Sequence, residues 1–150
     1  MSGYITVPPS RAARARLGEI PGAGDIQYEP QSVEAPSGSM LPNGDGARFP
    51  ELNEDSLWAD HFFTVPAGAP DIEFKWMLVT PKRTRSFKYF MDLNADNKLC
   101  EFNCYGATPS SIVEHIVPLG GWTGRRTILG VWELADSPNS YYQAVDLLIE

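Results

Sequence analysis

The chain has 150 residues, 43% of them hydrophobic, with a formal charge of −7 and a pI near 4.8. This length suits one domain whose core can be large enough to fold without metal or disulfide staples. The acidic balance excludes a duplex-binding role, because neutralising phosphates requires surplus Lys and Arg. No stretch is long and apolar enough to span a membrane. We therefore expect a single domain over residues 1–150 that binds neither nucleic acid nor a membrane.

The first residues lack the charged, apolar and cleavage regions of a secretory signal peptide. We therefore expect synthesis in the cytoplasm. From there the protein would act inside a particle or leave by a route that needs no such signal.

The residue pattern of the first part of the chain predicts short secondary-structure elements and a long loop. Residues 3–7 are extended in character, and an Arg/Ala-rich segment after Pro8 predicts one or two helical turns. Residues 25–70 show little periodicity and many Pro, Gly, Asn and Asp residues, with one possible short helix between Pro50 and Trp58. Loops of such length in a compact domain are usually functional, so we expect a binding surface here.

After Pro70 the pattern changes to that of β-strands. Residues 72–80 alternate between apolar core candidates and more exposed positions, which predicts a half-buried strand. Further strands are predicted at residues 86–92, 127–134 and 140–149. Strands without intervening helices favour an antiparallel β-sandwich, in which Trp76 and Trp132 should face inward.

The chain has two cysteines, Cys100 and Cys104. Their spacing forms neither a Cys-x-x-Cys redox motif nor a two-cysteine zinc half-site. A disulfide between them would close a very short loop and is geometrically demanding.

Several motifs resemble those of a known enzyme family. The run Ile-Gln-Tyr-Glu-Pro-Gln-Ser-Val-Glu at residues 26–34 resembles the signature of the bacterial chitin-active lytic polysaccharide monooxygenases. The segments Val-Trp-Glu-Leu-Ala-Asp at 131–136 and Asn-Ser-Tyr-Tyr-Gln-Ala-Val-Asp at 139–146 also match, as do Gly3-Tyr4 and Phe74-x-Trp76. The resemblance covers essentially the whole chain. It implies an immunoglobulin-like or fibronectin-III-like sandwich with a long loop region after the first strand.

The resemblance also implies a substrate surface. In the family, polar and aromatic residues of the first motif bind crystalline chitin, and they correspond to Tyr28, Glu29, Pro30 and Glu34. An exposed aromatic ring can stack on a sugar ring, and carboxylates can accept hydrogen bonds from its hydroxyl and acetamido groups. The implied ligand is chitin or a related N-acetylglucosamine glycan, and a protein partner on the same face is the alternative.

The family's copper is held by two histidines, and here the sequence departs from the pattern. The corresponding positions carry Ser2 and Lys82, while the axial aromatic position carries Tyr141. A serine cannot replace an imidazole, and a protonated lysine repels Cu²⁺. The remaining histidines, His61 and His115, match no ligand of this site. The sequence therefore predicts a pseudoenzyme: no catalytic residues, no copper and no other metal.

The family's disulfides are missing as well. Ala15 and Ala23 occupy the positions of one cysteine pair, and Val117 occupies the position of the cysteine that would pair with Cys100. The resemblance therefore predicts free thiols and a reducing compartment.

Three functions remain open from the sequence. The leading one is a non-catalytic module that binds a polysaccharide or a protein. The alternatives are an active copper-dependent polysaccharide monooxygenase with an atypical site, and a structural component of a virus or phage-tail-like particle.

Overall fold

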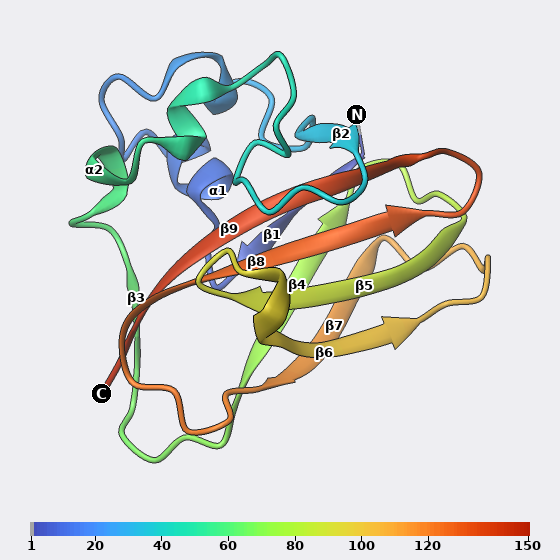
Figure 1. Cartoon of the computed structure of the whole chain (residues 1–150). Coiled ribbons are helices and arrows are strands. Elements are labelled where there is room, and N and C mark those ends of the chain that lie inside the picture. The colour runs from blue at the N-terminus through green and yellow to red at the C-terminus, as the bar shows by residue number, and fades with distance from the viewer. Residues whose placement is uncertain (1) are drawn as a thin grey trace.

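The computed structural model of the protein describes residues 2–150. Met1, the first residue of the predicted domain, lies outside the described residues. Two β-sheets pack face to face, and two short helices and long loops cover one of them (Figure 1). This arrangement confirms the predicted all-β sandwich with a loop region after its first strand.

The smaller sheet has three antiparallel strands in the order β1-β4-β7. Their bounds are Gly3–Val7 for β1, Asp71–Leu78 for β4 and Ile112–Pro118 for β7. Strand β4 is exposed at alternate positions, as its sequence predicts, and Trp76 on its inner face is fully buried.

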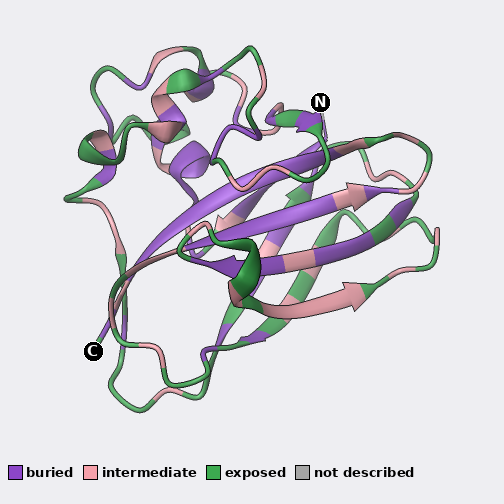
Figure 2. Ribbon diagram, viewed as in Figure 1, coloured by how far each residue is buried: buried purple, intermediate pink, exposed green. Residues whose placement is uncertain are grey.

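The larger sheet has six strands, five of them in the order β2-β9-β8-β5-β6, with β3 pairing parallel to β9. Their bounds are Glu34–Pro36 for β2, Phe63–Val65 for β3, Thr84–Met91 for β5, Lys98–Asn103 for β6, Gly124–Leu134 for β8 and Asn139–Ile149 for β9. Strand β9 is nearly continuously buried, and β8 is mostly buried from Ile128 onward (Figure 2). The smaller sheet covers one face of these strands, and the helices and loops between β1 and β3, which we call the loop layer, cover the other.

The loop layer contains the two α-helices, α1 at Arg11–Arg16 and α2 at Asp55–Trp58, and two single-turn helices, η1 at Gly24–Gln27 and η2 at Pro50–Asn53. A third single-turn helix, η3 at Ala95–Asn97, lies between β5 and β6. Ser10 caps α1, because its hydroxyl accepts a hydrogen bond from the Ala13 amide at 3.1 Å. No helix among residues 2–150 is long and apolar enough to cross a membrane.

The molecule has two apolar cores. The core between the sheets contains Trp76 and Trp132, both at 0% exposure, which confirms their predicted inward orientation. Gly130 allows the sheets to approach at this level, since a Cβ atom there would lie 2.7 Å from Ile5 and 3.2 Å from Trp76. The second core lies between the larger sheet and the loop layer, around Trp58 and Tyr142.

The sequence prediction missed four strands: β2, β3, β6 and β7. The first two have only three residues each and lie in the predicted loop region. Strand β6 shows mostly intermediate burial along its length, and β7 lies at the edge of its sheet, so neither carries a simple alternation of apolar and polar residues.

Candidate functional site

The beginning of the chain is fixed at one end of the sandwich. The Ser2 amide donates to the Gln31 carbonyl at 3.1 Å, and the Ser2 carbonyl accepts from the Thr80 amide at 3.1 Å. Ser2 is fully buried, and its hydroxyl is the one buried side-chain polar atom in residues 2–150 without a hydrogen-bond partner. These contacts place Ser2 between the Tyr28 loop and the end of β4.

Glu34 lies at the same end, on the short strand β2. Pairing of β2 with β9 sets Glu34 opposite Tyr141, whose hydroxyl donates to the Glu34 carboxylate at 2.8 Å. The other carboxylate oxygen accepts from the Asn139 side chain at 3.0 Å. Burial alone would raise the pKa of Glu34, but these two hydrogen bonds and the positive charge of Lys82 outweigh it, so the pKa lies below its ordinary value.

Tyr141 is almost fully buried, with 1% exposure. Burial, followed by the hydrogen bond to Glu34 and that group's charge, raises the pKa of Tyr141 to about 12, while the neighbouring Ser2 side chain acts in the opposite direction. The phenol is therefore neutral at physiological pH, and its proton is directed at Glu34. The structure thus brings together Ser2, Lys82, Tyr141 and Glu34, and we call this group the Ser2 corner.

A cavity of about 380 Å³ opens beside this corner. Its lining residues are Glu34, Lys82, Arg83, Leu134, Asp136 and Ser137. Arg83 and Asp136 form an ion pair across it at 2.7 Å. The cavity therefore offers a mixture of cationic and anionic groups that can hydrogen-bond to a polar ligand.

The donors at the Ser2 corner are a hydroxyl, an amine, a phenol and a carboxylate. No group of three or more His, Cys, Asp or Glu residues within 2–150 could hold a metal ion. His115 lies in β7 and His61 lies in the loop before β3, where its nearest acidic partner is Glu19 at 3.8 Å. The residues present therefore do not fit a copper centre with two imidazole ligands.

The predicted chitin-binding residues lie next to the corner. Tyr28 follows η1 and is 75% exposed. A second cavity of about 380 Å³ lies beside it, lined by Tyr4, Arg16, Gln27, Tyr28, Pro30, Gln31, Met77 and Val79. Gln31 connects the two places, because its carbonyl binds the Ser2 amide.

Glu29 and Pro30 have more restricted roles in the structure. Glu29 forms an ion pair with Arg48, and this hydrogen bond lowers the pKa of Glu29. Pro30 is buried, and its carbonyl accepts a hydrogen bond from the Gln143 side chain at 3.3 Å. Direct contact of these two residues with substrate stays a prediction.

Asn139 and Gln143 were not among the predicted site residues. Asn139 orients Glu34, and Gln143 accepts hydrogen bonds from the Ile5 amide at 3.2 Å and the Ser10 hydroxyl at 2.6 Å. Both lie in the C-terminal motif, but their partners are more than 100 residues away in sequence. Only the sheet pairing reveals them.

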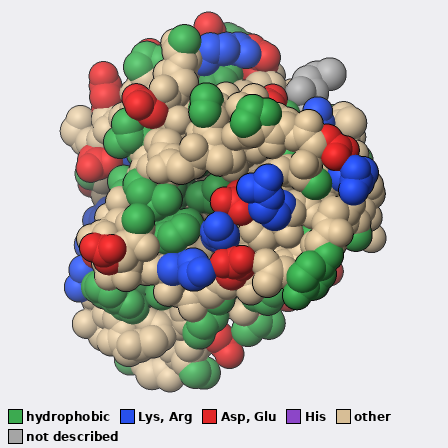
Figure 3. Space-filling view, turned by 45° about the vertical axis from the view of Figure 1, so that its right-hand side comes forward, with side chains coloured by type: hydrophobic (Ala, Val, Ile, Leu, Met, Phe, Trp, Pro, Cys, Tyr) green, Lys and Arg blue, Asp and Glu red, His purple; other side chains and the backbone are tan. Residues whose placement is uncertain are grey.

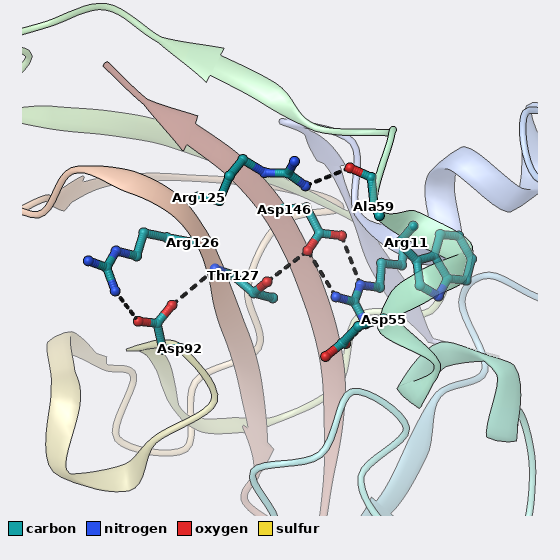
Figure 4. Close-up of a pocket in the computed structure, with 9 residues that line it drawn as sticks. Arg11, Asp55, Ala59, Asp92, Arg125, Arg126, Thr127 and Asp146 are labelled. Atoms are coloured by element: carbon teal, nitrogen blue, oxygen red, sulfur yellow. Dashed lines mark hydrogen bonds and ion pairs between the residues drawn. The ribbon is translucent and has the colours of Figure 1, made fainter.

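A cavity of about 210 Å³ lies further along β8 and β9, toward the C-terminal end of β9 (Figure 4). Arg11 is buried there and donates two hydrogen bonds to Asp146, at 2.8 and 2.9 Å, and a third to Asp55. Asp146 also accepts from the Thr127 hydroxyl at 2.7 Å. Because these polar groups already satisfy one another, we interpret this network as a connection between the loop layer and the sheet.

The charges on the face that Figure 3 shows do not indicate a partner of one particular charge. Acidic and basic side chains lie next to one another there, and no broad field of one sign is visible. In the same way, opposite charges pair in Lys88–Glu133 at 3.0 Å and in Lys98–Glu101 at 2.7 Å. This distribution is compatible with a neutral ligand such as a polysaccharide.

A family model described as "Lytic polysaccharide mono-oxygenase, cellulose-degrading" matches residues 3–147. This chain belongs to the lytic polysaccharide monooxygenase family. A lytic chitin monooxygenase of Streptomyces ambofaciens is 39% identical over 146 residues, which cover 97% of this chain and 80% of that protein. The neutron structure of a Jonesia denitrificans lytic polysaccharide monooxygenase has a TM-score of 0.89 and 31% identity, with 99% of each chain covered.

These relatives contradict two predictions. The prediction that the chain is not an enzyme is wrong, because the relatives to which the chain is similar are named as monooxygenases. The prediction that copper is lost is contradicted too, because the chain belongs to a family of monooxygenases and is 39% identical to a relative named as one. The sequence argument failed because it inferred loss of function from the residue types at two positions alone.

Proposed function

We propose that this chain binds a chitin-like polysaccharide with the surface around Tyr28 and the Ser2 corner, and that it acts there as a polysaccharide monooxygenase with an atypical site. The observation that carries the proposal is the position of Tyr28, which is 75% exposed and adjoins the loop that holds Ser2. An exposed aromatic ring on a rigid loop offers a stacking platform for a sugar ring.

Polar groups for the rim of the sugar lie next to this platform. Glu34 is exposed and ionised, and its orientation is set by Tyr141 and Asn139. A carboxylate fixed in this way can accept a hydrogen bond from a hydroxyl or acetamido N–H group without losing much side-chain entropy on binding. Lys82 and Arg83 in the adjoining cavity supply donors.

The oxidative part of the proposal rests on the family relationship. The Ser2 corner differs from a two-histidine copper site, so we assign no residue of this chain as a ligand. The roles that we do assign are binding by Tyr28, hydrogen bonding by Glu34, and orientation of Glu34 by Tyr141. The relatives reported above are named for polysaccharides, so a protein partner and a place in a virus or phage-tail-like particle stay predictions.

Binding and oxidation can be tested separately. Incubation with insoluble chitin, with cellulose as the comparison, should deplete the protein from solution on chitin. With Cu²⁺ and ascorbate, mass spectrometry should then detect oxidised oligosaccharides, which a chelator should abolish. Retention without oxidised products would reject the oxidative part alone, and no retention on either polymer would reject the whole proposal.

A single variant examines the atypical site. Replacing Lys82→His exchanges a cation for an imidazole and should raise Cu²⁺ affinity in calorimetry. Arg83→His, which places an imidazole at the neighbouring residue on the same cavity, is the matched control and should change copper affinity less. Equal effects of the two variants would show that the Ser2 corner is not the metal-binding position.

A further inference from the structure

The turn between β6 and β7 carries the most exposed large apolar side chain of residues 2–150. This side chain is Tyr105, which is 89% exposed and belongs to neither of the two apolar cores. The other tyrosines are buried, apart from Tyr28. The fold therefore presents two tyrosine rings to the solvent, one in the predicted binding loop and one outside the candidate site.

The backbone at Tyr105 has a conformation that tyrosine does not favour. The Ala107 amide donates to the Cys104 carbonyl at 2.9 Å and closes a tight turn. Both central residues of this turn have positive φ, 52° for Tyr105 and 85° for Gly106. Such turns favour Asn or Asp followed by Gly, and a bulky residue with positive φ is an outlier. The stability of the turn therefore does not account for a tyrosine at this position.

The turn is bonded to the start of β5 and to the wall of the corner cavity. The Gly106 amide donates to the Thr84 carbonyl at 2.8 Å. Arg83 Nε donates to the Gly106 carbonyl at 2.9 Å, and Nη1 of the same guanidinium donates to the Asp136 carboxylate at 2.7 Å. Arg83 and Asp136 both line the cavity beside the Ser2 corner. These bonds hold the turn, and the ring that it carries, in one place beside the corner.

The corner and its cavity separate the two exposed tyrosines. On one side, the loop of Tyr28 holds Ser2 through the Gln31 carbonyl. On the other side, Arg83 holds the Tyr105 turn. Figure 1 shows that the β4–β5, β6–β7 and β8–β9 connections gather at the same end of the sandwich, and residues of the first and third line the cavity. Tyr105 is therefore placed at the end of the molecule that contains the candidate site.

We propose that Tyr105 is a second stacking platform for a sugar ring, so that a polysaccharide held at Tyr28 extends over the Ser2 corner and also contacts Tyr105. An aromatic ring on a rigid turn loses little conformational freedom on binding, and its face matches the apolar face of a sugar. Residues kept in an unfavourable backbone conformation cluster at ligand-binding sites. Between the two rings, Lys82 and Glu34 in the cavity face the hydroxyl and acetamido groups of the bound chain.

This role of Tyr105 rests on the proposed polysaccharide binding, and it is independent of the oxidative part of that proposal. It creates a conflict between stability and binding at one residue. Replacing Tyr105 by a residue that accepts positive φ should stabilise the fold and weaken adsorption at the same time. A side chain that serves only the fold does not give this combination.

The test compares Tyr105→Asn and Tyr105→Phe with the wild type on insoluble chitin. Tyr105→Asn should raise the melting temperature by about 2 °C or more, because Asn accepts positive φ more readily. It should also weaken adsorption roughly fivefold, as expected for the loss of one stacked ring. Tyr105→Phe keeps the ring and should adsorb like the wild type. Circular dichroism checks the fold of each variant.

Phe63→Ala is the matched control for adsorption. Phe63 is an exposed aromatic residue on β3, which pairs with β9 around Leu147, far along that strand from Tyr141, so its loss should leave adsorption unchanged. Equal losses in Phe63→Ala and Tyr105→Asn would overturn the inference, as would a lowered melting temperature in Tyr105→Asn. A loss in Tyr105→Phe as large as that in Tyr105→Asn would overturn stacking as the mode of contact.

Tyr28→Ala separates this inference from the function on which it rests. Weaker adsorption of Tyr28→Ala together with unchanged adsorption of Tyr105→Asn would overturn the role of Tyr105 alone. A wild type that is not retained on chitin would overturn both the proposed binding and the contact at Tyr105.

Discussion

Glu34 and Tyr141 face each other across the β2–β9 ladder, and the Tyr141 hydroxyl donates to the Glu34 carboxylate at 2.8 Å. This contact joins the loop region to the last strand beside Ser2. It also explains why a carboxylate at the end of a short strand can keep one orientation on an exposed surface.

The Glu34 contact should make stability depend on pH. The folded-state pKa of Glu34 is lowered, so its contribution is present above the unfolded pKa and is lost as pH falls through the folded pKa. Glu34→Gln should cost about 1 kcal/mol or less at pH 7, because the group is partly exposed, and the difference from the wild type should close below about pH 4. Urea denaturation at several pH values measures it. In a Tyr141→Phe background the cost should be smaller, and a cost independent of both pH and residue 141 would contradict this account.

Tyr28→Ala should weaken binding to chitin without changing stability. Loss of one stacked ring costs about 1 kcal/mol, which is roughly a fivefold weaker affinity. Tyr28 is 75% exposed and contributes little to either core, so the melting temperature should stay the same. Binding isotherms on chitin provide the measurement. Phe63→Ala is the matched control, since Phe63 is also an exposed aromatic residue but lies on β3, and equal losses for both variants would indicate nonspecific adsorption.

Cys100 and Cys104 are unbridged in the structure and half-buried against the core. Burial raises the pKa of Cys100 to about 11 and also raises that of Cys104, so both thiols are poorly reactive at pH 7. A reductant should leave the melting temperature unchanged, and titration in denaturant should find two thiols per chain. A melting temperature lowered by several degrees would reveal a disulfide and reject the prediction of a reducing compartment.

The buried ion pair of Arg11 and Asp146 should dominate the stability of the loop layer. Arg11 and Asp146 are 3% and 8% exposed, and Asp146→Asn would leave Arg11 with only the exposed Asp55 as a charged partner. Breaking such a pair costs about 3–5 kcal/mol. Asp136→Asn, at the exposed Arg83 pair, should cost about 1 kcal/mol or less and serves as the control in urea denaturation. Similar costs for the two variants would mean that Arg11 finds another partner.

The sequence alone determined the strands whose side chains alternate. The pattern around Trp76 and the aromatic strand at Trp132 predicted both the β-structure and the inward faces, because a strand buried on one side must repeat every second residue. The resemblance to the family identified Tyr28 and Glu34 as surface candidates, since their motif is one continuous run of residues. It did not identify β6, which is only partly buried, or β7, whose exposed positions include the apolar residues Ile112 and Ile116 and so hide the alternation.

Only the tertiary structure decided which distant residues meet. Glu34 reaches Tyr141, Pro30 reaches Gln143, and Tyr89 reaches His115 because strands pair and sheets stack, and sequence spacing contains no record of either. The exposure of Tyr28 and the burial of Pro30, two positions apart in one motif, were likewise decided by packing. Local patterns report the period of an element and its apolar face, whereas the contacts that build a site arise from the free energy of the whole packed chain.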